Sequence, residues 1–195
     1  FTGFPYYYHT IGSAFAVTAD AYVRAGGMGR QQGGEDFYFL QKIFPMGKVA
    51  VLDEVFVYPM ARFSERVPFG TGPALQKIIA EPNGRINVYS MDAFVALKEL
   101  FDRIALFFKQ PEREIEKQIE QLHPSLQEFI RRNHMQDAIL DCNANCASIV
   151  SFRKRFFHHF NAFFIIKYLN FAHQSYFNLE PLDTCRNNYS IYIGN

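Results

Sequence analysis

Two glycines followed by two carboxylates, Gly33-Gly34-Glu35-Asp36, constrain the fold of this chain more than any other stretch. Glycine adopts backbone conformations that other residues avoid, so the pair predicts a sharp turn with space beside the acids. The apolar residues from Phe37 to about Phe44 predict a helix that begins here. Because a helix N-terminus is partly positive, we expect both acids to be ionised, exposed at a cleft edge and firmly held. The alternative is an ordinary capped surface helix.

Short predicted elements lie on both sides of this turn. Upstream, residues Gly12 to Val17 predict a short buried strand, and Thr18 to Ala25 predict a short helix that Gly26-Gly27 closes. Downstream, Gly47 precedes two apolar runs, residues 49–52 and 55–58, which predict extended chain. Each feature is common by itself, so the order in which they occur is the more specific signal.

This order of features resembles the C-terminal part of the catalytic domain of family-two glycosyltransferases, which have the GT-A fold. In that family a glycine-serine strand precedes a short helix ending in Gly-Gly, and a Gly-Glu-Asp turn then opens a second helix. The match covers roughly residues 9 to 72, about a third of the chain. The matching residues are Gly12 and Ser13, Gly26 and Gly27, Gly34-Glu35-Asp36, and Gly47 with the strand to Tyr58.

The resemblance implies a role for each acid. Asp36 would be the catalytic base of an inverting transferase, taking the proton of an acceptor hydroxyl as that oxygen attacks the anomeric carbon of an activated sugar. Glu35 would orient the acceptor or the turn. Gly12 and Ser13 would contribute to substrate binding.

An aromatic segment, Tyr6-Tyr7-Tyr8-His9, leads into the first predicted strand. Tyrosine rings suit sugar binding, because a pyranose face is apolar while its rim forms hydrogen bonds. Tyr8 is therefore a candidate substrate-binding residue. Burial of these rings at a sheet edge is the alternative and the more common arrangement.

The segment from Pro59 to Gly72 is rich in proline and glycine and predicts a loop. Within it Arg62 and Arg66, with Ser64 and Thr71, can bind a diphosphate, because guanidinium groups match the geometry of phosphate oxygens. In GT-A enzymes a loop in this region commonly closes over the donor. The alternative is a surface loop whose arginines pair with nearby acids.

The chain also departs from the family pattern. Tyr58-Pro59 stands where many members place a histidine metal ligand, so we assign no metal ligand here. The absence of tryptophan excludes the Gln-x-x-Arg-Trp motif of processive members and favours an enzyme that adds one sugar or a few. The sequence begins at Phe1 and holds no Asp-x-Asp metal site, which in GT-A enzymes belongs to the N-terminal, nucleotide-binding half.

These departures predict a C-terminal fragment that is inactive by itself and needs no cofactor as a fragment. The resemblance implies that the intact enzyme uses manganese or magnesium, a nucleotide-sugar donor, and a carbohydrate or glycoconjugate acceptor. The sugar, the nucleotide and the acceptor are not specified by the sequence.

Composition narrows the remaining classes of protein. At 195 residues and 49% hydrophobic content, the chain is long enough for one large domain or two small ones. A net charge of +1 favours neither nucleic-acid nor membrane-surface binding. Three cysteines form no disulfide framework and suit a reducing compartment, so we expect a cytoplasmic protein. No signal peptide is apparent, and no apolar run is long enough to cross a bilayer.

The fold class predicted is α+β and predominantly α-helical: residues 1–72 form the acceptor-side part of a GT-A domain, and residues 73–195 form a helical domain. Apolar residues at helical spacing support the second part. The expected elements are a helix from Pro73 to about Ala80, extended chain at Ile86–Tyr89, a helix capped by Ser90, a helix opened by Pro111, a capping box of Ser125 and Glu128, and a long helix from about Ala144 to Ala172.

The last predicted helix carries a wide aromatic face that needs a partner surface. Packing within the monomer is the simplest arrangement, and a homodimer through the helical half is the alternative. The corresponding alternative function is a non-catalytic helical module for interaction or dimerisation.

Cysteines and histidines in the C-terminal half give no recognisable metal motif. Cys142 and Cys146 can meet on a helix face, yet zinc needs two more ligands, and none has suitable spacing. Adjacent His158 and His159 point about 100° apart on a helix. The basic run Arg153-Lys154-Arg155 is interpreted as a solvated face.

Overall fold

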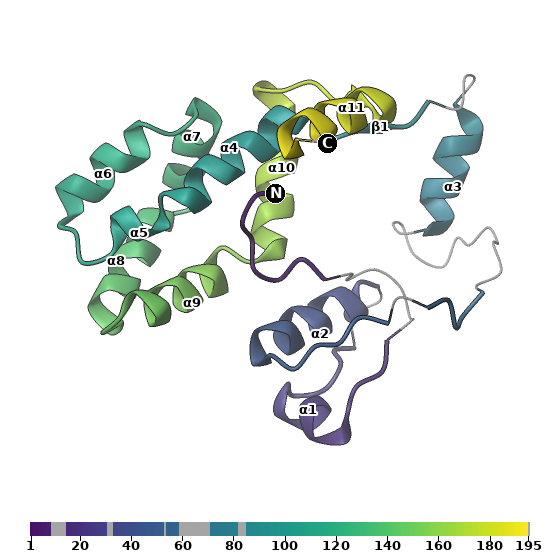
Figure 1. Ribbon diagram of the computed structural model, residues 1–195, viewed down its shortest axis with the longest axis horizontal. Helices are drawn as coiled ribbons and strands as arrows, with labels where there is room; N and C mark the ends of the chain where they lie inside the picture. The colour runs from purple at the N-terminus through teal and green to yellow at the C-terminus, as the bar shows by residue number, and fades with distance from the viewer. Residues whose placement is uncertain (9–14, 31–32, 53, 59–70, 82–84, 195) are drawn as a thin grey trace. The chain divides into compact units, whose positions relative to one another are not determined.

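The computed structural model describes residues 1–8, 15–30, 33–52, 54–58, 71–81 and 85–194 (Figure 1). Within these residues the protein is predominantly helical and contains one two-stranded sheet, which confirms the mainly helical class. The chain divides into two compact units. The smaller unit is Tyr6–Arg85, and the helical unit combines Phe1–Pro5 with Ile86–Asn195. This division falls later in the chain than the predicted boundary after residue 72.

The smaller unit contains two helices that the glycines delimit. Helix α1 (Ala19–Arg24) begins at Thr18, whose side chain accepts a hydrogen bond from the Ala21 amide at 3.3 Å. It ends at Gly26 and Gly27, which have φ of 74° and 71°, a region that suits glycine. The predicted helix and its Gly-Gly end are thus confirmed. The remaining elements of this unit are α2 (Glu35–Ile43), the 3₁₀ turn η1 (Phe44–Met46) and α3 (Thr71–Ala80).

The core of the smaller unit is built around α2. Phe39, Leu40 and Phe44 are buried, and partly buried side chains pack against them. The Tyr22 ring of α1 lies 5.3 Å from the Phe39 ring, so α1 covers one side of α2. The partly buried contributors are Tyr6, Tyr8, Phe15, Val17, Ala25, Met28, Ile43 and Val49.

The predicted strands of this unit are not formed in the described residues. Residues 15–17, 49–52 and 54–58 lie in neither helix nor strand, while residues 12–14 of the first predicted strand lie outside the described residues. A strand needs a neighbour for its backbone hydrogen bonds, and no strand of this unit is assigned among the described residues. The apolar side chains of Val51, Leu52, Val55, Phe56, Val57 and Tyr58 are exposed as a result.

The helical unit consists of short helices and two strands that pair with each other, and its last helix follows the second strand. Apolar stripes explain the helices: Ile115, Ile119 and Leu122 are all buried, as their spacing predicts. In chain order the elements are β1 (Asn87–Val88), α4 (Met91–Asp102), α5 (Ile104–Phe107), α6 (Glu112–Glu120), α7 (Pro124–Arg132), α8 (Met135–Asn145), α9 (Ile149–His159), α10 (Ala162–Ser175), β2 (Glu180–Pro181) and α11 (Leu182–Ile193).

The start of α7 differs from the predicted capping box of Ser125 and Glu128, which is wrong. His123 is the cap, and its Nδ1 accepts a hydrogen bond from the Ser125 amide at 3.2 Å. Pro124 takes the first helical position, where its missing N–H costs nothing, so the cap lies one residue before it. Ser125 is fully buried instead, and its hydroxyl lies 2.8 Å from the Tyr168 hydroxyl.

The predicted long helix from Ala144 to Ala172 is interrupted twice. Ser148 and Ser151 form a capping box that starts α9, with amide-to-hydroxyl distances of 3.2 Å in both directions. Asn161 starts α10, since its side chain accepts a hydrogen bond from the Phe164 amide at 3.1 Å. These polar side chains replace helical hydrogen bonds and begin new helices. As a result, α9 packs on α8 and α10 packs on α7.

Aromatic side chains fill the core of the helical unit. The Phe156 and Phe160 rings stack at 6.0 Å, and Phe101 contacts Phe160 edge-on at 5.5 Å. On α7, the Phe129 ring lies 5.4 Å from that of Tyr168. The aromatic residues of the predicted long helix therefore find much of their cover within the monomer, the simpler of the two predicted arrangements.

A polar clasp joins the start of α4 to the end of the chain. Strands β1 and β2 pair antiparallel, Val88 opposite Glu180, and extended chain was predicted at β1. The Ser90 hydroxyl donates a hydrogen bond to Glu180 Oε1 at 2.6 Å, and the Ser90 amide donates one to His173 Nε2 at 2.8 Å. Ser90 also caps α4 as predicted, by accepting a hydrogen bond from the Asp92 amide.

Glu128 links two helices and gives a prediction on acid stability. Its carboxylate accepts a hydrogen bond from the Tyr176 hydroxyl and pairs with Arg132. The Tyr176 hydrogen bond and the Arg132 charge lower the pKa of Glu128. A carboxyl with a lowered folded-state pKa stabilises the fold above its unfolded-state pKa, and this contribution is lost as the pH falls through the folded-state pKa.

We therefore expect Tyr176→Phe to lower the free energy of unfolding at neutral pH, and to have a smaller effect at an acidic pH below the lowered pKa of Glu128, where the carboxyl is protonated. Urea unfolding followed by circular dichroism at the two pH values measures this difference. Tyr192→Phe is the control, because Tyr192 lies on the exposed side of α11. Equal losses for Tyr176→Phe at both pH values would contradict the assigned role of Glu128.

Candidate functional site

The acidic turn at the start of α2 has the geometry that its glycines predict. Gly33 and Gly34 have φ of 137° and 73°, and Gly34 is the N-cap of α2 in the left-handed conformation. Side chains with a Cβ are disfavoured at both angles, so other residues would strain this turn. Glu35 and Asp36 occupy the first two positions of α2, which begins two residues before the predicted start at Phe37.

Both carboxylates are half-buried beside the N-terminal end of the helix. Asp36 Oδ1 accepts a hydrogen bond from the Phe37 amide at 2.7 Å. The amides of the first helical turn have no partner within the helix, and their partial positive charge favours an anion at this place. Buried Phe39 and Leu40 hold the helix that carries the two acids.

Tyr8 contributes to the core of the smaller unit. Its ring lies 4.9 Å from the Phe44 ring and stacks with Tyr7 at 5.8 Å. Tyr7 is 84% exposed, whereas Tyr8 is half-buried. Packing thus accounts for Tyr8, and a contact from Tyr8 to a sugar stays a prediction.

The other predicted substrate-binding residues lie outside the described residues. They are Gly12 and Ser13 from the glycine-serine strand, and Arg62, Ser64 and Arg66 from the proline-rich loop. Their roles, and their distances from the two acids, stay predictions.

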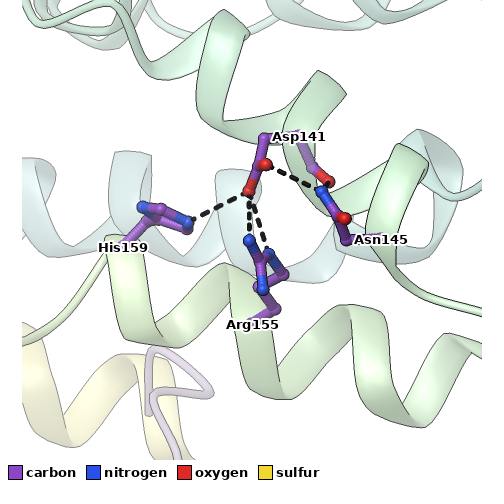
Figure 2. Close-up of polar contacts among 4 residues, drawn as sticks. All are labelled: Asp141, Asn145, Arg155 and His159. Atoms are coloured by element: carbon purple, nitrogen blue, oxygen red, sulfur yellow. Dashed lines mark hydrogen bonds and ion pairs between the residues drawn. The ribbon is translucent and has the colours of Figure 1, made fainter.

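A second polar cluster lies between α8 and α9 of the helical unit (Figure 2). Asp141 is at its centre: Arg155 Nε and Nη2 both donate hydrogen bonds to Oδ2, at 2.9 and 2.7 Å. Asn145 Nδ2 donates to Oδ1 at 2.8 Å, and His159 Nε2 lies 3.7 Å from Oδ2. The last residue of the predicted basic face, Arg155, is therefore an ion-pair partner.

Asp141 and Arg155 favour each other's charged form, whereas His159 is disfavoured as a cation. The hydrogen bond from Arg155 lowers the pKa of Asp141 and raises that of the guanidinium. Burial lowers the pKa of His159, and the neighbouring His158 lowers it further, while Asp141 raises it.

Cys142 extends this cluster toward the core. Its side chain is 1% exposed, and burial, with a smaller effect of Cys146, raises its pKa to about 11. Asp141, Cys142 and His159 each offer one ligand atom, and these atoms all lie within 4.8 Å of one another. No short metal motif indicates this group in the sequence, because His159 comes from a different helix than Asp141 and Cys142. The available signal was the amphipathic pattern of the two helices, which indicates that they pack against neighbours.

A shallow hollow in the helical unit involves none of the predicted site residues. Its volume is about 230 Å³, and it is open to solvent. Pockets for drug-sized ligands usually reach about 300–1,000 Å³, so this hollow is too small for a nucleotide-sugar. Its lining is Asp92, Val95, Ala96, Glu99, His123 and Phe177.

Comparison with known proteins found no family model, no curated protein and no solved structure that matches this chain. Across the parts of the chain that the structure describes, no helix combines the length and the apolar composition needed to cross a membrane. Within the described residues, the acidic turn and the cluster between α8 and α9 are the two candidate sites.

Proposed function

We propose that this chain is the acceptor-side part of an inverting, non-processive glycosyltransferase, which moves a sugar from a nucleotide-sugar donor to an acceptor hydroxyl. The observation that carries the proposal is the start of α2, where two glycines with positive φ precede Glu35 and Asp36 in the first helical turn. A general base must be in its charged form and firmly positioned, and the N-terminal end of a helix favours both.

In the proposed reaction Asp36 takes the proton of the acceptor hydroxyl as that oxygen attacks the anomeric carbon. The new glycosidic bond forms while the bond from that carbon to the diphosphate oxygen breaks, and the nucleoside diphosphate leaves. Glu35 holds the acceptor. We assign no ligand of the divalent manganese or magnesium ion to this sequence; when bound to the intact enzyme, the ion would neutralise the charge that develops on the diphosphate.

Exposed apolar residues after α2 give further support. Val51, Leu52 and Val55–Tyr58 lie in neither helix nor strand, and their side chains are more than half exposed. An apolar run of this kind gains stability when other strands cover it. The nucleotide-binding half of a GT-A domain would supply such strands.

The proposal is tested with the intact protein that contains this sequence. We expect it to release nucleoside diphosphate from one of a panel of nucleotide-sugars when manganese or magnesium and a carbohydrate acceptor are present. Proton NMR of the product should show an inverted anomeric centre. The 195-residue chain alone should show no turnover with the same panel. Retention of the anomeric configuration, or no release from any donor by the intact protein, would overturn the proposal.

A non-catalytic module that dimerises through the helical unit is the alternative function. Exposed apolar side chains of α11 favour it, and Ile191 is 76% exposed. If the alternative holds, the sedimentation coefficient rises with protein concentration, and Ile191→Glu abolishes this rise. A sedimentation coefficient that does not change with concentration would exclude it. The other exposed apolar residues of α11 are Leu182, Tyr189, Tyr192 and Ile193.

A further inference from the structure

The cluster between α8 and α9 brings together three kinds of metal ligand. Asp141 and Cys142 are neighbours near the end of α8, and His159 is the last residue of α9. One carboxylate oxygen, the Cys142 sulfur and one His159 nitrogen all lie within 4.8 Å of one another. In a tetrahedral zinc site the bonds from metal to ligand are about 2.0–2.3 Å long. Small side-chain rotations therefore suffice to place the three atoms around one ion.

The identity of the ligands indicates which ion fits. Thiolate, imidazole and carboxylate together are the ligand types of zinc sites, whereas calcium and magnesium prefer sets made of oxygen alone. Two of the ligands would be anionic, the Asp141 carboxylate and the Cys142 thiolate, and the ion would share the Asp141 charge with Arg155. Coordination itself removes the thiol proton, so the buried Cys142 need not be ionised beforehand.

Neighbouring groups prepare the carboxylate for this role. A carboxylate has about four lone-pair sites, and Asp141 uses three of them for Arg155 and Asn145. Because Arg155 donates twice to Oδ2 and Asn145 donates once to Oδ1, the site left for a cation is on Oδ1. Hydrogen bonds of this kind orient the ligands of metal sites and strengthen metal binding. Figure 2 shows the side chains of Arg155, from α9, and Asn145, from α8, pointing toward the Asp141 carboxylate.

One side of the cluster is open to solvent, and the opposite side is buried. Cys142 is buried, whereas the side chains of Asp141 and His159 are 41% and 35% exposed. A metal ion can thus approach from solvent through Asp141 and His159 and meet the sulfur at the inner end. Since α9 packs on α8, the ion would join two helices that already lie together.

We propose that Asp141, Cys142 and His159 form a zinc-binding site that joins α8 to α9, with a fourth position open to water or another ligand. This proposal is independent of the acidic turn and of the transferase activity. Its test therefore uses metal binding and stability as readouts.

The first measurement is a titration of the metal-free chain with Co²⁺, which replaces Zn²⁺ and reports thiolate ligation by absorbance. We expect one Co²⁺ to bind per chain, with a thiolate-to-cobalt charge-transfer band that Zn²⁺ abolishes. Zn²⁺ should also raise the thermal unfolding temperature, because it binds only the folded site. Absence of the charge-transfer band at saturating Co²⁺ would overturn the proposal.

Variants then assign the ligands. Cys142→Ser should abolish the charge-transfer band, and His159→Gln and Asp141→Asn should each weaken Zn²⁺ binding by about tenfold or more. Because Cys142 is buried and its variant can unfold, the two variants at partly exposed positions keep the test decisive. His158→Gln and Cys185→Ser are matched controls, which should bind Zn²⁺ as the unchanged chain does. Unaltered affinity in His159→Gln, or loss of the band in Cys185→Ser, would overturn the assignment.

Discussion

Replacing Asp36 with asparagine in the intact protein is expected to lower turnover by about 10²- to 10⁴-fold, the usual contribution of a general base. Asparagine keeps the size of the side chain and can still accept a hydrogen bond from the Phe37 amide, which Asp36 accepts at 2.7 Å. It cannot take a proton from the acceptor. Affinity for the nucleotide-sugar donor should change little, because the donor is bound mainly by residues outside this turn.

Two further variants distinguish a loss of proton transfer from a general effect on the structure. Glu35→Gln should raise the KM for the acceptor more than it lowers kcat, since Glu35 is proposed to hold the acceptor. Asp20→Asn is the matched control: Asp20 also lies in the first turn of a helix, and its pair with Arg24 is largely exposed. Retained turnover in Asp36→Asn, or an equal loss in Asp20→Asn, would eliminate Asp36 as the base.

Phe156→Ala is expected to lower the free energy of unfolding of the helical unit by about 3–5 kcal/mol, the usual cost of removing a buried phenylalanine. The Phe156 side chain is 2% exposed, and its ring contacts those of Phe157 at 5.5 Å and Phe160 at 6.0 Å. Its loss leaves a cavity at the centre of the aromatic core, which the surrounding helices can fill only in part.

Denaturant unfolding followed by circular dichroism measures this loss. Val150→Ala is the control on the same helix, because Val150 is 74% exposed and its truncation should change stability by less than about 0.5 kcal/mol. Phe156→Leu should give an intermediate loss. Equal stability of the Phe156→Ala and Val150→Ala variants would mean that the aromatic cluster does not stabilise the unit.

Helices were predictable from the sequence where spacing and end signals agree. Ile115 and Ile119 mark the buried face of α6, and Gly26-Gly27 marks the end of α1. The long helix was wrong because the aromatic spacing continues across Asn161, although that side chain starts a new helix. Local hydrogen bonds decide such breaks, and a count of apolar positions does not reveal them.

Elements that depend on distant partners were harder to predict. Residues 49–52 and 55–58 have the composition of strands, but a strand also requires a neighbour to supply hydrogen bonds. Helix α11 was not predicted, since its residues show only a weak apolar stripe and its large apolar side chains are all at least partly exposed.

The two candidate sites also differ in whether local or distant residues position them. Glu35 and Asp36 could be predicted because the turn that positions them is local and needs only Gly33 and Gly34. The group around Cys142 could not, because His159 approaches it only after α9 packs on α8.

The polar clasp has a consequence for the order in which the helical unit forms. Contacts such as those of α6 with α7 and α8 with α9 join neighbours in the sequence and can form early, because short loops cost little entropy to close. Ser90, in contrast, is 83 residues from His173 and 90 from Glu180. During synthesis this junction can therefore close only after Glu180 has been made, and we expect it to close last and to exchange its amide protons first.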